Sequence, residues 1–377
     1  MEKYFKTSVI ILVLTASVLP VWAVAATKAP AQPTFIYSAW LPYWKEASST
    51  QEISPYLNKF QEVSPFSFEV KPDGTLTDKL KIGEAPWPDF FALASSTKTK
   101  IIPTIAWFND EAIHALMKDA TQRKNHVANI MALVIANNFA GVDIDYENKL
   151  AGTKKYFSSF IKELATELHK QKKILSCTVE PRTPLASRFK VIPKSIEYAN
   201  DYKVLNIYCD EVRVLAYDQG VIDLLLNKKY EKKQPYAPVA DKIWAEKVLK
   251  ETLKTISRKK IVLGVPTYGY EYQLSGSGTN ISYNRLHSET FKSAMDQAFS
   301  LGIIPGRNVS GELSFTYATS TFPVLAQSSV ATSTRFVTFN DAKSMGDKIK
   351  LAKKYGLRGV AFFKFDGETD PAIWPSL

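Results

Sequence analysis

Eight strand-like segments alternate with amphipathic segments along most of this 377-residue chain. One of the intervening segments, residues 154–170, places apolar side chains at helical spacing and predicts an amphipathic helix. Eight strand–helix units predict a closed parallel barrel with its active site at the carboxyl ends of the strands. We therefore predict the α/β class and a (β/α)8 TIM barrel, although length alone would also allow two domains. The predicted strands are Thr34–Ala39, Val63–Val70, Lys100–Trp107, Gly141–Tyr146, Ile174–Val179, Glu211–Ala216, Lys260–Pro266 and Gly359–Phe365.

The segment after the seventh predicted strand breaks this pattern. Residues 270–339 are rich in Ser, Thr, Gly and Asn and are too long for an ordinary loop. They contain a helix-like stretch, Glu289–Leu301, and strand-like stretches at Leu313–Tyr317 and Arg335–Thr338. We predict a small inserted α+β subdomain that forms one wall of a cleft, within a single barrel domain over residues 34–377.

Residues 1–25 have the features of a secretory signal peptide. Lys3 and Lys6 form a basic start, an apolar stretch follows, and Ala23-Val24-Ala25 is a small-residue cleavage site. An uncleaved membrane anchor is the alternative, because the apolar stretch approaches spanning length. A Pro/Ala spacer over residues 26–33 leads into the barrel. We expect a secreted or cell-envelope protein that contacts a membrane only through this N-terminal segment.

The formal net charge of the whole chain is +11 at pH 7. Cleavage would remove Glu2, Lys3 and Lys6, which carry a net +1, and would leave +10 on the mature protein. For an exported protein this charge favours anionic cell-wall polymers or membrane surfaces. No basic helix or arginine-rich run indicates nucleic-acid binding. We expect a monomer.

The cysteines and histidines give no sign of a metal or cofactor site. Cys177 and Cys209 lie in apolar surroundings, so two buried free thiols are the preferred interpretation, with a disulfide left open. The four histidines show no metal-ligand spacing. We therefore predict no metal and no cofactor.

Three acidic residues recur at every second position in Gly141-Val142-Asp143-Ile144-Asp145-Tyr146-Glu147. Side chains of a strand alternate between its faces, so Asp143, Asp145 and Glu147 share one face. If that face is enclosed, the three groups cannot all be ionised, and at least one pKa is raised. A carboxyl group that is protonated near neutral pH is what a general acid needs. The alternative is a one-sided strand with a solvated polar face.

The acidic segment and three others at predicted strand ends resemble glycoside hydrolase family 18, the chitinase-like barrels. The resemblance covers essentially the whole mature chain, and the acidic segment is its most specific part. Within the family the chain is most similar to the bacterial peptidoglycan-acting branch, which includes spore-cortex-lytic N-acetylglucosaminidases. Pro65-Phe66-Ser67-Phe68, near the second strand, supports this branch. The other three segments are Leu215-Ala216-Tyr217-Asp218, Leu263-Gly264-Val265-Pro266-Thr267-Tyr268-Gly269 and Gly359-Val360-Ala361-Phe362-Phe363.

The resemblance implies substrate-assisted catalysis, in which the sugar's own acetamido group is the nucleophile. It makes Glu147 the acid that protonates the leaving oxygen and then the base that activates water. Asp145 would orient the acetamido group, and Asp143 would lie deeper and share a proton with Asp145. Tyr217 would donate its hydroxyl to the acetamido carbonyl oxygen, with Asp218 beside it in the substrate site.

Four further aromatic residues are candidates for sugar binding. Exposed aromatic rings stack on sugars, and Phe363, Tyr268, Trp40 and Trp107 all lie near predicted strand ends. Trp44 is placed similarly. Packing in the barrel core explains each of these residues equally well, so both interpretations remain open here.

The chain departs from the family pattern at three places. Ala140 stands where the acidic motif usually begins with Asp, and Phe363 stands where a Trp usually floors the sugar site. Asn148-Lys149 replaces the Tyr-Pro that often follows the acid in chitinases. These changes bear on turnover, on affinity and on similarity to a typical chitinase, but the acid itself is present.

We therefore expect an exported glycosidase, an N-acetylglucosaminidase or chitinase, that cleaves β-1,4 bonds next to N-acetylglucosamine. Peptidoglycan is the preferred substrate over chitin, because the basic charge suits an anionic wall. One alternative is a non-catalytic carbohydrate-binding protein on the same barrel. Another is a scaffold or transglycosylase whose acceptor is a second sugar.

Overall fold

The computed structural model describes residues 1–2, 4, 35–276, 281–321 and 331–377. Apart from residues 1, 2 and 4, the predicted signal peptide and spacer lie outside the described residues. The described residues from 35 onward belong to one compact unit. None of the helices within the described ranges has both the length and the apolar character needed to cross a membrane.

Eight parallel strands close into a barrel, which confirms the predicted fold. Each strand pairs with the next, and the first strand pairs with both the second and the last. The eight are β1 (Ile36–Pro42), β2 (Glu62–Val70), β5 (Thr104–Trp107), β6 (Gly141–Tyr146), β7 (Ile174–Val179), β8 (Glu211–Val214), β9 (Ile261–Pro266) and β15 (Gly359–Phe363).

The third predicted strand, residues 100–107, is divided in two. Its first part, β4 (Lys100–Ile101), pairs only with β2, and β5 resumes at Thr104. Pro103 lies at the break, and proline has no backbone N–H to donate to a neighbouring strand. A short strand, β3 (Leu76–Asp78), pairs antiparallel with the last residues of β2, Phe68 to Val70.

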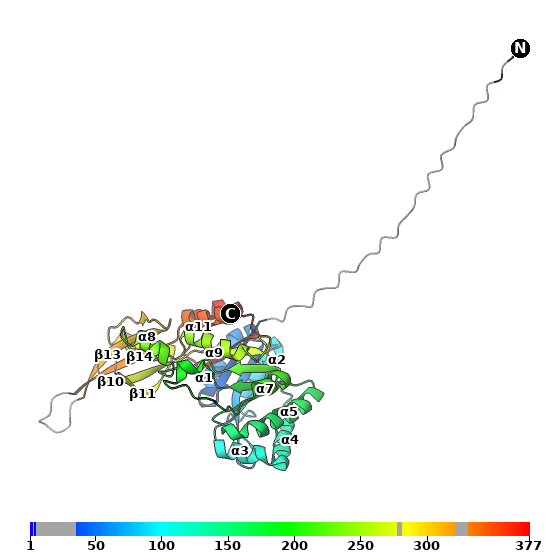
Figure 1. The fold of residues 1–377 in the computed structure, drawn as a ribbon, viewed down its shortest axis with the longest axis horizontal. Coiled ribbons are helices and arrows are strands. Elements are labelled where there is room, and N and C mark those ends of the chain that lie inside the picture. The colour runs from blue at the N-terminus through cyan, green and yellow to red at the C-terminus, as the bar shows by residue number, and fades with distance from the viewer. Residues whose placement is uncertain (3, 5–34, 277–280, 322–330) are drawn as a thin grey trace. The chain divides into compact units, whose positions relative to one another are not determined.

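Helices cover the outside of the barrel, and α4 and α5 lie side by side there (Figure 1). The helix predicted over residues 154–170 is α5, with the same bounds, and its apolar stripe is buried. Val142, Ile144 and Tyr146 of β6 belong to the same core. The helices are α1 (Glu46–Ile53), α2 (Trp87–Thr97), α3 (Asp110–Lys118), α4 (Ala120–Ala136), α5 (Lys154–Lys170), α6 (Leu185–Arg188), α7 (Tyr202–Tyr208), α8 (Leu224–Tyr230), α9 (Lys242–Leu253), α10 (Phe291–Ser300) and α11 (Ala342–Lys354).

The inside of the barrel is polar below the mouth. Arg213 of β8 is fully buried there, with guanidinium nitrogens 3.5 Å from a Glu62 carboxylate oxygen and 3.6 Å from one of Glu211. It also donates a hydrogen bond to the Ser64 hydroxyl. Buried charges of this kind are tolerated only when paired, so these contacts fix the arrangement of the strands around them.

The insertion after β9 forms a five-stranded antiparallel sheet with one helix, α10, which confirms the predicted α+β insertion. In Figure 1 its strands are coloured yellow to orange and lie away from helices α3, α4 and α5. Three strands of this sheet, β10, β11 and β12, were not anticipated from the sequence. In order across the sheet the strands are β11 (Ser282–Glu289), β10 (Gly269–Ser275), β14 (Ala331–Phe339), β13 (Leu313–Thr321) and β12 (Gly306–Arg307).

Cys177 and Cys209 form a disulfide, so the preferred interpretation of two free thiols is wrong. Cys177 lies in β7, and Cys209 follows α7, the helix that leads into β8. Their Cα atoms are 6.1 Å apart although 32 positions separate them in the sequence. The pairing depends on how the chain returns to the barrel, which the spacing of two cysteines cannot reveal.

Candidate active site

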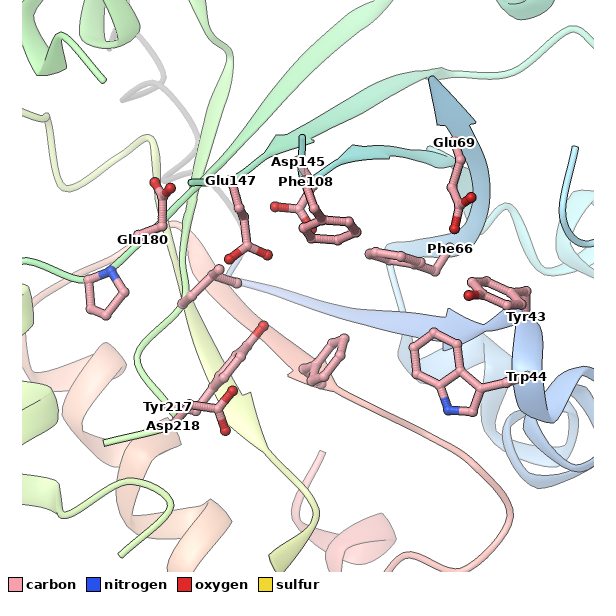
Figure 2. Close-up of a pocket in the computed structure, with 13 residues that line it drawn as sticks. Tyr43, Trp44, Phe66, Glu69, Phe108, Asp145, Glu147, Glu180, Tyr217 and Asp218 are labelled. Atoms are coloured by element: carbon pink, nitrogen blue, oxygen red, sulfur yellow. The ribbon is translucent and has the colours of Figure 1, made fainter. Parts of the chain in front are cut away.

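A cleft of about 400 Å³ opens at the carboxyl ends of the strands (Figure 2). It contains four carboxylates at one side, and a fifth, Glu69, lies with a group of aromatic rings at the other. None of the described residues that line it belongs to the insertion, so the prediction that the insertion forms one wall of the cleft is wrong for the described residues. The lining residues are Tyr43, Trp44, Phe66, Glu69, Phe108, Asp145, Glu147, Glu180, Pro181, Leu215, Tyr217, Asp218 and Phe363.

Glu147 is the central group of the carboxylate side. It directly follows β6, and its backbone N–H donates to the Trp107 carbonyl at 2.9 Å, which continues the strand pairing by one residue. Its side chain lies between Glu180 and Asp145 (Figure 2). Burial and the like charges of Glu180 and Asp218 raise the pKa of Glu147 to about 7. Glu147 can therefore hold a proton near neutral pH and release it to a bound molecule.

Asp145 lies next to Glu147 on the inward face of β6 and is 4% exposed. Burial, together with the charges of Glu147 and Asp143, raises its pKa well above the ordinary value. Its Oδ1 atom has no hydrogen-bond partner among the described residues. A buried polar atom without a partner carries a free-energy cost that a bound polar group would remove.

Asp143 lies deeper, on the barrel axis side of β6, and is fully buried. Within the described part of the chain no hydrogen bond joins Asp143 to Asp145. The structure therefore gives no direct contact through which these two side chains would share a proton. The Asp143 oxygens instead accept from four side chains. The donors are Trp40 Nε1 at 3.3 Å, Thr104 Oγ1 at 2.9 Å, Ser176 Oγ at 2.7 Å and Thr178 Oγ1 at 2.9 Å.

Tyr217 and Asp218 enter the cleft from the end of β8. The Tyr217 hydroxyl points toward the carboxylates (Figure 2). Close approach of its ring requires a glycine in β9, because a Cβ on Gly264 would lie 2.8 Å from Tyr217 Cε1. Asp218 is held by the hydroxyls of Tyr268 and Tyr270, which donate to its Oδ1 at 2.5 and 2.6 Å. Tyr268 thus acts on the site through Asp218 and does not line the cleft.

The structure separates the other aromatic candidates. Phe363 lines the cleft and stacks on Tyr217, with ring centroids 5.2 Å apart and 12° between the planes. Trp40 is buried beneath it, between Phe363 and Asp143. Trp107 points away from the cleft into the core below the helices, where its ring lies 5.6 Å from that of Tyr146. Strand alternation explains this, because Ala106 takes the inward position.

Sequence reasoning missed Glu69 and, on the carboxylate side of the cleft, Glu180. Glu180 directly follows β7, and its Oε1 accepts from the backbone N–H of Asn148 at 3.0 Å. Its Oε2 accepts from Asn200 Nδ2 at 2.7 Å. Asn148 has a left-handed φ of 56°, so Glu180 stabilises an uncommon backbone turn immediately after Glu147. Its position directly after a predicted strand was the signal by which the sequence could have revealed it.

Lys149 was noted only as a departure from the family pattern, but it is a buried cation behind the cleft. Its Nζ has no hydrogen-bond partner in the described structure and lies 4.7 Å from the centroid of the Phe157 ring. Burial lowers the pKa of Lys149, while the charges of Glu180, Asp145 and Glu147 oppose that shift. Lys149 therefore balances part of the negative charge gathered at the mouth.

A further cluster lies outside the cleft, in the inserted sheet. Glu271, His287 and Glu289 bring one possible metal-ligand atom each to within 4.8 Å of one another. Glu271 already accepts hydrogen bonds from Tyr317 and Gln297, and His287 is hydrogen-bonded to Glu289. The cluster thus satisfies itself without an ion, and we assign it no function.

The fold and the cleft together define a class of enzyme. A β/α barrel presents a carboxyl group with a pKa near 7 beside a second, buried carboxyl group at the carboxyl ends of its strands. Proton donation to a leaving oxygen, assisted by a neighbouring carboxylate, is how glycoside hydrolases cleave their bonds. The arrangement is that of a glycoside hydrolase.

Comparison with known proteins identifies the family. The model for glycosyl hydrolases family 18 matches residues 39–368. A putative sporulation-specific glycosylase, YdhD of Bacillus subtilis, is 22% identical over 329 residues, which are 85% of this chain and 70% of that protein. The chain therefore belongs to glycosyl hydrolases family 18 and is a glycosidase, as the resemblance predicted.

Solved structures of family members share the fold. The spore cortex-lytic enzyme SleL of Bacillus megaterium QM B1551 superimposes with a TM-score of 0.71 at 20% identity, covering 92% of this chain and 74% of that one. A chitinase from Chromobacterium violaceum ATCC 12472 also gives a TM-score of 0.71 at 20% identity, covering 91% and 98%. At this identity the likeness establishes the barrel and not the substrate.

Proposed function

We propose that this protein is an exported glycosidase that cleaves β-1,4 linkages next to N-acetylglucosamine, in peptidoglycan or chitin-like glycans, by substrate-assisted retaining catalysis. The observation that carries the proposal is Glu147 at the end of β6, with a pKa of about 7, facing the Tyr217 hydroxyl and adjoining Asp145. These are the groups that the reaction needs at one place.

In the first step Glu147 donates its proton to the glycosidic oxygen while the acetamido carbonyl oxygen attacks the anomeric carbon. The bond to the leaving sugar breaks, and a cyclic oxazolinium ion forms. Asp145 accepts the acetamido N–H with its unpartnered Oδ1 and balances the new positive charge. Tyr217 donates its hydroxyl to the acetamido oxygen and orients it for attack.

In the second step Glu147, now a carboxylate, takes a proton from water, and the hydroxide opens the oxazolinium ring. Two displacements at the anomeric carbon leave its configuration unchanged. Phe363, Trp44 and Phe66 supply aromatic surface for the sugar rings at the other side of the cleft. Trp44 is 46% exposed, so its ring is accessible to a glycan chain.

Several features support export and a wall substrate. A disulfide persists in oxidising compartments and is rare in reducing ones. The net charge of +11 favours an anionic polymer over neutral chitin. Solved structures with the same fold include a protein named as a spore cortex-lytic enzyme.

The test is digestion of purified peptidoglycan and of chito-oligosaccharides by the mature protein, with mass analysis of the products. We expect new reducing ends at N-acetylglucosamine, formed first as the β-anomer, which NMR detects within minutes. The Glu147→Gln variant, prepared identically, controls for contaminating enzymes. Wild-type protein that binds these glycans but cleaves neither would favour the alternative, a non-catalytic carbohydrate-binding protein. First products of the α-anomer would contradict the retaining mechanism.

A further inference from the structure

Two more hollows continue from the carboxylate side of the cleft. A small one of about 250 Å³ shares Glu180 and Pro181 with the cleft. A larger one of about 820 Å³ shares Arg182, Tyr198 and Asn200 with the small one. Together they form a path away from Glu147, past the end of β7, to the beginning of α5 and α7. We call this path the side groove.

Arg182 lies at the junction of the two hollows and is held in place by aromatic rings. Its guanidinium carbon is 3.9 Å from the ring centroid of Tyr198 and 3.6 Å from that of Tyr202. It donates to the Asn200 carbonyl, and no carboxylate of the described residues lies within ion-pair distance of it. A guanidinium fixed in this way presents its remaining donors in a geometry that suits a carboxylate.

Two buried polar atoms next to Arg182 also lack partners. Lys149 and Asn200 line the small hollow and are 9% and 6% exposed. Neither Lys149 Nζ nor Asn200 Oδ1 makes a hydrogen bond within the described structure. Unpartnered buried groups are uncommon in folded proteins and indicate a site that a ligand or water completes.

The outer hollow carries an excess of positive charge. Lys154, Lys155 and Lys203 line it with Arg182, against Glu197 and Asp201. Asp201 already pairs with Lys154 at 3.5 Å, which leaves Lys155 and Lys203 exposed and without an acidic partner in the described structure. The small hollow is likewise lined by three cations and two carboxylates, the carboxylates being Glu180 and Glu197.

We propose that the side groove binds a carboxylate-bearing peptide attached to the glycan, so that it selects peptide-substituted peptidoglycan over neutral chitin. The inference rests on the proposed function, since the glycan must lie in the cleft for a substituent to enter the groove. A neutral sugar chain offers no charge to match Arg182, Lys155 and Lys203. A peptide with free carboxylates does, and it supplies amide groups for Asn200.

The test measures binding in the Glu147→Gln background, so that hydrolysis does not interfere. The ligands are soluble peptidoglycan fragments with their peptides, and the same fragments after an amidase has removed the peptides. The test variant is Lys155→Glu with Lys203→Glu. The matched control is Lys228→Glu with Lys229→Glu, which makes the same charge change at two exposed lysines of α8. Unchanged circular dichroism and thermal midpoint show that both variants fold.

We expect the test variant to lower the ratio of affinities for peptide-bearing over peptide-free fragments about tenfold at low salt, as two lost charge contacts at a surface would. The control should leave that ratio unchanged. An equal effect on both ligands, or an equal effect of both variants, would overturn the proposal that the side groove binds the peptide. Binding is measured without turnover. Failure of the wild type to hydrolyse glycans would therefore contradict the proposed function, whereas the ratio of affinities would still test whether the side groove binds the peptide.

Discussion

The floor and the mouth of the barrel show how one strand gives two acidic residues opposite surroundings. Asp143 and Glu147 lie four positions apart on the same face of β6 and its continuation. At the floor, Asp143 is surrounded by hydrogen-bond donors, with an Arg213 nitrogen 3.8 Å away. At the mouth, Glu147 faces the like charges of Glu180 and Asp218. The floor satisfies its carboxylate, whereas the mouth keeps its carboxyl group reactive.

This difference assigns stability to the floor and proton transfer to the mouth. A buried carboxylate with donors on every side contributes to the fold, and its loss leaves buried hydroxyls without their acceptor. A carboxyl group whose pKa burial and neighbouring charges raise to about 7 contributes little to the fold but can donate a proton. Substitutions at the two places should therefore separate stability from activity.

The largest expected effect is at the mouth. Glu147→Gln should lower kcat on chito-oligosaccharides about 100- to 10,000-fold, because it removes the general acid. Its free energy of unfolding in urea should match or exceed that of the wild type, since one of several like charges is gone. Reducing-end assays and urea titration measure the two quantities. A large loss of stability in this variant would remove the distinction between the two regions.

At the floor, Asp143→Ala should lower the free energy of unfolding by about 3–5 kcal/mol, because several buried donors lose their acceptor at a cost of about 1–3 kcal/mol each. The reason is that Trp40 and the surrounding hydroxyls lose their shared acceptor, whereas Arg213 keeps Glu62 and Glu211. Urea unfolding followed by tryptophan fluorescence measures the change. Ser38→Ala, at another buried position inside the barrel, is the control and should cost much less.

The strand that holds Asp143 from one side also carries the disulfide. Cys177 lies between Ser176 and Thr178, which both donate to Asp143. Replacing Cys177 and Cys209 together by Ala should cost about 3–4 kcal/mol, from the loop closed across 32 positions. Chemical denaturation measures this cost, and kcat at 25 °C should stay close to the wild-type value. A loss of activity without loss of stability would show that β7 positions the mouth directly.

Glu180→Gln tests the charge that acts on Glu147. The acid must be protonated, so kcat/KM should fall as the pH rises through about 7 in the wild type. Removing the Glu180 charge lowers the pKa of Glu147, and this decline should move to lower pH. The glutamine can still accept from the Asn148 N–H, so the loss at the optimum pH should stay below about tenfold. Glu180→Ala, which removes the acceptor too, should lose more.

Lys149→Met should produce the smallest change, and in the opposite direction. Lys149 holds the pKa of Glu147 down, so its removal should move the decline of kcat/KM to higher pH. Stability should be equal or higher, because an apolar side chain replaces a buried ammonium group without a hydrogen-bond partner. The pH profiles of both variants form one comparison. If the decline of kcat/KM moved in the same direction in both variants, the neighbouring charges would not control the pKa of Glu147.

The periodic features of the chain were predictable, and the contacts between distant segments were not. The bounds of α5 and the inward face of β6 follow from local spacing, which the sequence displays directly. Trp40, Trp44 and Trp107 all lie near strand ends, yet one contacts Asp143, one lines the cleft and one packs below the helices. Strand β11 was missed because it is largely exposed and carries no apolar alternation.

The sequence by itself determined the barrel and the acidic row of β6, because strand and helix periodicity are properties of neighbouring residues. Only the tertiary structure decided which groups act on that row. Glu180, Asp218 and the donors around Asp143 come from other segments of the chain than β6, and the disulfide joins two segments 32 positions apart. Charge and hydrogen bonding act through space, so the reactivity of Glu147 is fixed where the strand ends meet and not along the chain.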